Sequence, residues 1–229
     1  MPLIVDKRNF LSEYTSLKIW HTTESEATLS AMFPMAAVDS SQRLADITSS
    51  QRRLEILVSY ILFQLTFPPE AELLHRNSGG PLAWGTPMCM SISHTKGYVA
   101  LISSPYPVGI DIEMWSPRAL RIAHKFLKPQ EMRLMDTDEE RERDAIRLWT
   151  AKEAVYKCWS ENITLHEDIL LAPGTKSPLE ATCPAIPWIP ATSIYLPCVS
   201  DEISEKMSLA VALLDQEELE EPEKYARYS

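Results

Sequence analysis

Three short β-like runs in the middle of the chain constrain its fold more than any other feature. They read MCMSISH, GYVALIS and PVGIDIE, and turn-forming segments, Thr95-Lys96-Gly97 and Ser104-Pro105-Tyr106-Pro107, separate them. Apolar runs of this length bounded by Gly, Pro and Ser are typical of β-strands. We therefore predict three consecutive strands.

Helical patterns flank these strands on both sides. In SSQRRLEILVSYILFQL a serine precedes apolar residues at helical spacing, which predicts a capped amphipathic helix that ends before Pro68-Pro69. A second helix is predicted from its cap at Ser116 to Lys128-Pro129, and a third from about Glu139 to Trp159. Helices mixed with local strands indicate an α+β fold and not a regular βαβ alternation.

Composition limits the class of protein. The chain has 229 residues, of which 45% are hydrophobic, and this is enough for a core in one domain or in two modest halves. The net charge is −10 with no long Lys/Arg run, so neither nucleic acid nor an anionic membrane is an expected partner. The proline-rich last third contains two strand candidates, SIYLPCVS and MSLAVALL, and ends in an acidic tail over about residues 215–229.

The cysteines and the N-terminus indicate a cytoplasmic protein. Four cysteines lack the C-x-x-C spacing of a zinc site and the density of a disulfide scaffold, so we expect reduced thiols. The first residues, MPLIVDKRNF, place charges where a signal peptide needs an apolar core. No apolar run approaches the ~20 residues that span a bilayer.

Two carboxylates lie in the third predicted strand, VGIDIEMW. Asp111 and Glu113 are two residues apart and therefore project from the same face, while Ile110 and Ile112 fill the other face. Close carboxylates repel each other, and Mg²⁺ is a cation that oxygen ligands of this kind bind well. A half-exposed strand with a polar face is the alternative interpretation.

The third predicted helix contains LWTAKEAVYK, in which Glu153 and Lys157 are one turn apart. At 3.6 residues per turn they lie away from the apolar stripe of the helix and alongside Ile146 and Trp149. An exposed Glu–Lys pair, worth only ~0.2–0.5 kcal/mol, is one interpretation. A partly covered pair that binds a metal ion and a phosphate is the other. The apolar stripe consists of Leu148, Ala151, Val155 and Trp159.

Groups suited to phosphate lie upstream of these acids. Ser93, His94 and Thr95 are at the end of the first predicted strand, and their hydroxyls and imidazole could donate to phosphate oxygens. Arg52 and Arg53 open the first predicted helix and could do the same. Each is also compatible with an ordinary surface position. The second predicted helix carries a basic arc of four residues, Arg118, Arg121, Lys125 and Lys128.

Taken together, the acids, the lysine and the upstream donors are the parts of a Mg²⁺-dependent phosphoryl-group site. The chain contains no G-x-S-x-G of a hydrolase and no G-x-x-x-x-G-K-[ST] of a P-loop, and it has only six glycines.

At these residues the sequence resembles the larger, single-chain 4′-phosphopantetheinyl transferases. In family order, SISHT resembles the I-S-H-S block, VGIDIE the G-x-D-x-E block and LWTAKEAVYK the W-x-x-K-E-x-x-x-K block. The resemblance implies two similar α+β halves, residues 1–105 and 106–229, in a pseudo-twofold arrangement. The active site would lie in the cleft between them.

The resemblance also implies a reaction and its residues. The phosphopantetheine arm of coenzyme A would move to a serine of an apo acyl or peptidyl carrier protein, which releases adenosine 3′,5′-bisphosphate. Asp111, Glu113 and Glu153 would bind Mg²⁺, with Glu153 also a candidate base and Lys157 neutralising the departing phosphate. Coenzyme A phosphates would be contacted by His94 with Ser93 and Thr95, and by Arg52 and Arg53. The basic arc would contact an acidic carrier, and a monomer is expected.

Two departures from the family pattern keep other functions open. Gly80 stands where the family commonly has the lysine of G-K-P, and the family's glycine-rich segment after the last motif is here CWSENITLHED, without glycine. One alternative is a non-catalytic relative that binds carrier proteins or coenzyme A. The other is a Mg²⁺-dependent hydrolase of nucleotide pyrophosphates, which would use the same acids with water as the nucleophile.

Overall fold

The computed structural model describes residues 2–76, 80–135, 140–159, 163–174, 177–184 and 191–214. The predicted acidic tail, residues 215–229, lies outside the described residues. The chain divides into two compact units, Met1–Pro105 and Tyr106–Ser229. Each unit is described by itself.

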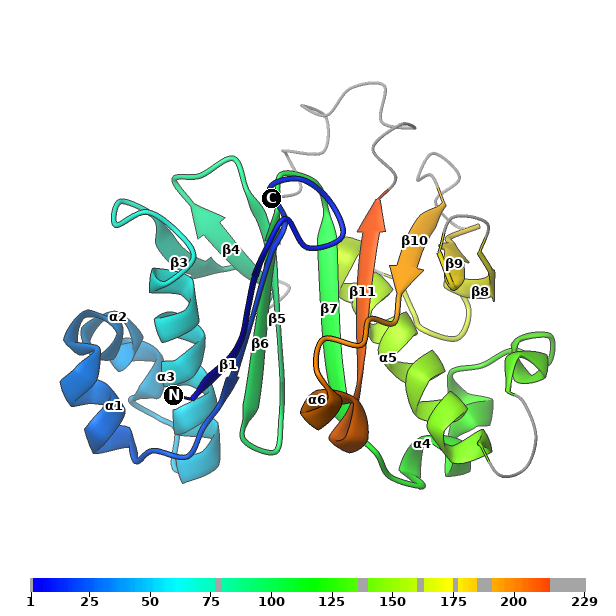
Figure 1. Ribbon diagram of the computed structural model, residues 1–229, viewed down its shortest axis with the longest axis horizontal. Helices are drawn as coiled ribbons and strands as arrows, with labels where there is room; N and C mark the ends of the chain where they lie inside the picture. The colour runs from blue at the N-terminus through cyan, green and yellow to red at the C-terminus, as the bar shows by residue number, and fades with distance from the viewer. Residues whose placement is uncertain are drawn as a thin grey trace. The chain divides into compact units, whose positions relative to one another are not determined.

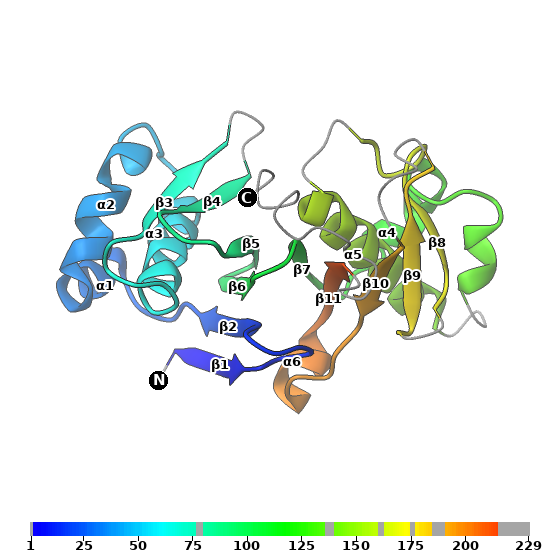
Figure 2. The same ribbon diagram turned by 90° about the horizontal axis from the view of Figure 1, so that it is seen from above.

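The first unit contains an antiparallel sheet with helices against it. The four-stranded sheet has the order β1-β2-β6-β5, and β3 and β4 form a separate hairpin. Helix α3 lies between the other two helices and the sheet, as Figures 1 and 2 both show. The elements are β1 (Leu3–Arg8), β2 (Ser16–His21), α1 (Glu26–Met32), α2 (Pro34–Leu44), α3 (Ser50–Gln64), β3 (Glu72–His75), β4 (Pro81–Trp84), β5 (Cys89–Thr95) and β6 (Tyr98–Ser104).

Helix α3 is the helix predicted from its capping serine. The hydroxyl of Ser49 accepts a hydrogen bond from the backbone N–H of Arg52, which satisfies one of the unpaired donors of the first turn. Apolar side chains of α3 pack with Val99 and Leu101 of β6 in the core of this unit. The helix ends at Gln64, before Pro68, as the sequence predicts.

The second unit is built on a five-stranded antiparallel sheet of order β7-β11-β10-β9-β8 (Figure 1). Helix α5 packs against β7 and β11. The elements are β7 (Val108–Met114), α4 (Arg118–Arg121), the 3₁₀ turns Ala123–Lys125 and Glu131–Leu134, α5 (Arg141–Trp159), β8 (Leu170–Pro173), β9 (Leu179–Thr182), β10 (Thr192–Tyr195), α6 (Asp201–Lys206) and β11 (Met207–Leu214).

Small residues let α5 approach the sheet closely. A Cβ atom at Gly109 of β7 would lie 1.9 Å from the carbonyl oxygen of Ala154, so only glycine fits there. Ala212 pairs with Gly109 on the neighbouring strand and is fully buried. The hydroxyls of Thr150 and Ser208 are 2.8 Å apart and join α5 to β11. This close contact positions the side chains that α5 and β7 direct toward each other.

Most predicted elements are confirmed. The three consecutive strands are β5, β6 and β7, and the third predicted helix is α5. The mixed α and β composition with several sheets is also as predicted. Of the two C-terminal candidates, MSLAVALL is the strand Met207–Leu214, whereas residues 196–200 of SIYLPCVS are irregular.

The predicted helix from Ser116 to Lys128 is wrong. Helix α4 ends after Arg121, and a 3₁₀ turn follows at Ala123–Lys125. Phe126 and Leu127 are buried in the core of the second unit, and the Phe126 ring packs edge-on against Trp149 at 5.0 Å. We attribute the change of path to this packing, which outweighs the local helical pattern.

Over the described part of the chain, no helix combines the length and apolar character that crossing a bilayer requires.

Candidate functional site

Two carboxylates of the second unit project from β7 toward α5. Asp111 is 6% exposed and Glu113 is partly buried, whereas Ile110 and Ile112 are buried on the opposite face. Strand alternation places both acids on the same face as Gly109, the residue in closest contact with α5. The predicted placement of the two acids is therefore observed.

Lys157 of α5 is close to the first of these carboxylates. Its Nζ atom donates to Oδ1 of Asp111 at 2.7 Å, and the Lys157 side chain is 27% exposed. Lys157 therefore contacts a residue of β7. An exposed Glu153–Lys157 pair on the helix surface would not predict this contact. Ile146 on the same side of α5 is buried and Trp149 is partly buried, so this side of the helix is covered.

Glu153 lies in an electrostatic environment that opposes its ionisation. Burial is the main cause of its raised pKa, and the negative charges of Asp111 and Glu113 raise the pKa further. Lys157 acts in the opposite direction. Glu153 thus interacts with both of the other carboxylates, and Lys157 offsets their effect on its pKa only in part.

The oxygen-rich donor set suits a hard cation such as Mg²⁺ in its chemistry. Among the residues that the structure describes, however, no group of three or more His, Cys, Asp or Glu side chains has the arrangement of a metal site. Lys157 interacts with Asp111 in the structure. A cation at these acids would therefore require side-chain movement.

A small pocket lies beside Glu113. It has a volume of about 110 Å³ and combines an apolar wall with one carboxylate and one guanidinium group. The lining residues are Glu113, Ser116, Arg118, Ala119, Ile122, Ile146 and Trp149.

The first unit contains a second, basic pocket, with a volume of about 140 Å³. Two arginines and two histidines line it, namely Arg43 of α2, Arg52 of α3, His75 of β3 and His94 of β5. Burial, together with the positive charges of Arg43 and Arg52, lowers the pKa of His75 to about 4. Positive charge in this pocket is therefore only partly compensated, which favours an anionic ligand.

Glu55 is the acid that orients two of these groups. Its carboxylate accepts a hydrogen bond from Arg52 at 3.1 Å and lies 3.3 Å from Nδ1 of His94. Nε2 of His94 contacts the Arg52 guanidinium group, which can only donate. This arrangement fits a neutral imidazole whose Nδ1–H points to Glu55.

The other predicted phosphate ligands lie elsewhere. Arg53 donates to Glu26 through Nε and Nη2, at 2.8 and 2.6 Å, and through Nη1 to two backbone carbonyls. Ser93 and Thr95 are buried, and strand alternation directs their side chains away from the face that carries His94. Of the five residues predicted to contact phosphate, the structure brings together Arg52 and His94.

The basic arc is not the face of one helix. Because α4 ends after Arg121, Lys125 and Lys128 follow a different path. Nζ of Lys128 donates to the carbonyl oxygen of Glu167 at 2.9 Å, and its side chain is thereby held within the second unit. Arg118, Arg121 and Lys125 are exposed.

Comparison with known proteins adds to this geometry. Residues 107–182 match the family model of the 4′-phosphopantetheinyl transferase superfamily. Over these residues, the chain is similar to members of that superfamily. The matched segment includes VGIDIE and LWTAKEAVYK, and SISHT precedes it.

Two curated relatives carry the same name as the superfamily. The chain is 29% identical over 120 residues to the 4′-phosphopantetheinyl transferase gsp of Aneurinibacillus migulanus, a match that covers 50% of this chain and 51% of the relative. It is 28% identical over 130 residues to the 4′-phosphopantetheinyl transferase psf-1 of Bacillus pumilus, covering 54% and 56%. The chain spans about half the length of the curated relatives it matches.

Three residues were missed by the sequence analysis, two that line the basic pocket and one, Glu55, that contacts Arg52 and His94 beside it. Arg43, Glu55 and His75 come from α2, α3 and β3 and meet only in the folded unit. Position 80, where superfamily members commonly have a lysine, contributes a carbonyl oxygen that accepts from the backbone N–H of Arg76 at 2.9 Å. No local pattern in the sequence marks these residues, since their proximity depends on the helix packing and on the β3–β4 register.

Proposed function

We propose that the chain transfers the 4′-phosphopantetheine arm of coenzyme A to a serine of an apo carrier protein. The observation that carries the proposal is the group formed by Asp111, Glu113, Glu153 and Lys157, since all four lie in the segment that matches the transferase superfamily. The serine oxygen would form a bond to the β-phosphorus of coenzyme A while the bond to the bridging pyrophosphate oxygen breaks. Adenosine 3′,5′-bisphosphate leaves with that oxygen.

Glu153 is the proposed acceptor of the serine proton, directly or through a water. In the metal-free chain the pKa of Glu153 is raised, which makes its carboxylate a better proton acceptor than an ordinary exposed glutamate. Lys157 would supply positive charge to the departing phosphate, because transfer between two oxygen nucleophiles depends mainly on positioning and charge neutralisation. For this purpose Lys157 has to leave Asp111.

Asp111, Glu113 and Glu153 are the residues that would hold Mg²⁺. The donor chemistry supports this assignment, because burial and then the charges of Asp111 and Glu113 raise the pKa of Glu153, and a cation would relieve the repulsion among the carboxylates. When bound, the cation would neutralise pyrophosphate charge.

The basic pocket of the first unit would hold a phosphate group of coenzyme A. Arg52 and His94 are the predicted ligands that line it, and we add Arg43 and His75. We propose Arg52 in preference to Arg53, whose guanidinium group is already bonded to Glu26. Arg43 and His75 can take the part of the lysine that position 80 lacks.

The finer predictions from the sequence and from the family resemblance also belong to this proposal. They are a pseudo-twofold arrangement of the two halves, an active site to which both contribute, a monomeric state and a cytoplasmic location. For an acidic carrier protein, the exposed residues Arg118, Arg121 and Lys125 are the candidate contacts.

The decisive test is intact mass spectrometry of apo carrier proteins incubated with the chain, coenzyme A and Mg²⁺. We expect a phosphopantetheine adduct on the carrier serine and none on a carrier whose serine is replaced by alanine. A panel of acyl and peptidyl carriers without any adduct would refute the transfer. Binding of coenzyme A without transfer would then favour the non-catalytic relative, and release of adenosine 3′,5′-bisphosphate without a carrier would favour the hydrolase.

Substitutions test the residue assignments. Asp111→Ala and Glu153→Ala should each lower turnover by about 100-fold or more, since each removes a group that acts on the transferring phosphate. Glu202→Ala on α6, which removes an exposed carboxylate of the same unit, is the matched control. Circular dichroism checks that each variant is folded. Near wild-type turnover in a folded Asp111→Ala or Glu153→Ala variant contradicts the assignment.

A further inference from the structure

A completely buried ion pair lies on another side of α5 from the proposed catalytic groups. Nζ of Lys152 is 2.9 Å from the carboxylate of Glu131, and both side chains are 0% exposed. Lys152 directly precedes Glu153, yet its charge is fully enclosed within the second unit. Neither side chain of the pair can therefore touch a substrate.

Every polar atom of this pair is used. Besides Glu131, the ammonium group of Lys152 donates to the carbonyl oxygens of Leu165 and Ile169, each at 2.8 Å. The carboxylate of Glu131 accepts from the backbone N–H groups of Leu171 at 2.8 Å and Lys128 at 2.7 Å. The three hydrogens of the ammonium group thus have three acceptors.

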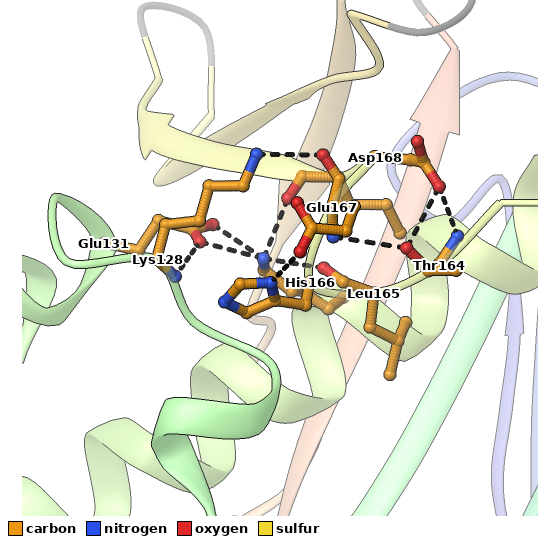
Figure 3. Close-up of polar contacts among 9 residues, drawn as sticks. Lys128, Glu131, Thr164, Leu165, His166, Glu167 and Asp168 are labelled. Atoms are coloured by element: carbon orange, nitrogen blue, oxygen red, sulfur yellow. Dashed lines mark hydrogen bonds and ion pairs between the residues drawn. The ribbon is translucent and has the colours of Figure 1, made fainter.

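The pair joins three segments of the second unit. These are the loop at Lys128 with the 3₁₀ turn Glu131–Leu134 that follows it, helix α5, and the segment that leads from Leu165 into β8. Figure 3 shows Lys128 and Glu131 directed toward the turn from Thr164 to Asp168. In that turn, Asp168 accepts from the backbone N–H of Thr164 at 2.7 Å, and this bond closes the turn on itself.

Stability alone is a weak reason for such a pair. Taking two charges out of water is costly, and replacing a buried pair by apolar side chains is often neutral or stabilising. Burial lowers the pKa of Lys152, and the hydrogen bond to Glu131 opposes this change. The pair also fixes the orientation of the Lys152 side chain, because all of its hydrogen bonds form together in only one geometry.

The fixed orientation of Lys152 also determines the direction in which Glu153 points. Successive residues of an α-helix are 100° apart around the axis, so fixing Lys152 on one side also fixes the direction of Glu153. On the side of the sheet, the close approach at Gly109 and the Thr150–Ser208 hydrogen bond limit movement of α5. The buried pair limits rotation from the other side.

We propose that Lys152 and Glu131 are positioning residues that hold α5 in the rotation at which Glu153 and Lys157 face β7. This rests on the proposed function, in which Glu153 and Lys157 act on the transferring phosphate. Lys152 is not a catalytic residue, because its side chain is fully buried and all three of its hydrogens have acceptors within the protein.

Two variants of the buried pair test the proposal. Glu131→Gln keeps an acceptor for the N–H of Leu171 and removes the charge, and Lys152→Met with Glu131→Leu removes both charges without leaving one unpaired. The matched control is Glu202→Gln on α6, whose partner Lys206 lies 2.9 Å away in an exposed pair of the same unit. Circular dichroism and thermal melts establish which variants are folded.

The first measurement separates turnover from binding. In the folded variants we expect kcat for carrier modification to fall by about 10- to 100-fold, because small displacements of reacting groups are costly. The KM for coenzyme A should stay within about threefold, since the pocket of Arg52 and His94 lies in the first unit. The double variant Glu131→Gln with Glu153→Gln should have a kcat only slightly below that of Glu153→Gln alone.

The second measurement does not depend on activity. Amide hydrogen exchange at Glu153 to Lys157 should become faster in both variants of the pair and stay unchanged in Glu202→Gln. Folded variants with wild-type kcat and wild-type hydrogen exchange in α5 overturn the proposal. It is also overturned if the loss of kcat caused by Glu131→Gln simply adds to the loss caused by Glu153→Gln. If the wild-type chain transfers no phosphopantetheine, the proposed function fails, and the exchange measurement still decides whether the pair holds α5.

Discussion

Glu153 is the residue at which function and stability oppose each other. Its pKa in the folded chain is raised above that of the unfolded chain, chiefly by burial and then by Asp111 and Glu113. Between the two pKa values the folded chain binds more protons, so the contribution of Glu153 to stability is present at low pH and is lost as the pH rises through that interval. Above that interval its ionised carboxylate therefore destabilises the metal-free fold.

The substitution Glu153→Gln should raise the thermal midpoint at pH 8 and make little difference at pH 4, while transfer is lost. Melting curves of wild type and variant across this pH range, without Mg²⁺, are the measurement. Glu202→Gln on α6 serves as a control because its carboxylate is exposed. If Glu153→Gln changes the thermal midpoint by the same amount at pH 4 and at pH 8, the raised pKa of Glu153 is contradicted.

Single residues also mark the limit of sequence reasoning. Arg52 and Arg53 are neighbours with the same side chain, and the sequence offers no reason to prefer either. The structure distinguishes them because Glu26, 27 residues earlier, binds Arg53, while Arg52 lies in the basic pocket. Which arginine meets Glu26 depends on how α1 packs on α3, and this packing leaves no local mark in the sequence.

At the scale of elements, the contact between β7 and α5 determines the geometry of the acidic group. A Cβ atom at Gly109 would lie 1.9 Å from the carbonyl oxygen of Ala154 and 2.6 Å from the backbone nitrogen of Cys158. Backbone atoms cannot move aside as a flexible side chain can. A larger residue at position 109 must therefore separate the helix from the strand.

We expect Gly109→Ala to lower the free energy of unfolding by about 1–3 kcal/mol or more, the usual cost of overpacking a core. Transfer should fall further than the fraction of folded protein, because the contact between Lys157 and Asp111 spans the same interface. Urea unfolding and kcat measured on the same samples test both statements. Thr182→Ala at an exposed position of β9 is the control, with an expected change within about 0.5 kcal/mol. Unchanged stability of Gly109→Ala would contradict the close packing.

Elements with strong local signals could be predicted, and those set by tertiary packing could not. The cap at Ser49 and the apolar periodicity of α3 and α5 lie within each segment, so both helices were predicted correctly. The segment after Ser116 has a similar local pattern, but burial of Phe126 against Trp149 ends the helix early. Strands β8 and β9 are four residues each and lie beside proline and glycine, which leaves no detectable alternation.

Charge is the property of the whole molecule that bears on the proposed partner. The chain has a net charge of −10, and an acidic carrier would be repelled at long range before it met Arg118, Arg121 and Lys125. Replacing Glu217, Glu218, Glu220 and Glu221 by glutamine removes four negative charges and changes the net charge to −6.

This quadruple variant should have a kcat/KM for an acidic carrier a few-fold higher than that of the wild type at low ionic strength. The gain should vanish at about 0.5 M salt, where the Debye length is a few ångströms. Transfer assays over a salt series are the measurement, and the KM for coenzyme A in the same series is the internal control. A gain that is independent of salt would have a cause other than long-range charge.

The Lys157–Asp111 ion pair also bears on how the whole molecule behaves without the proposed cation. An ammonium group that neutralises part of the acidic group lets the second unit fold before any divalent ion arrives. Metal dependence of turnover is thereby uncoupled from metal dependence of folding. A chelator should stop transfer at once and leave the melting curve intact, and restored Mg²⁺ should return full activity without a refolding step.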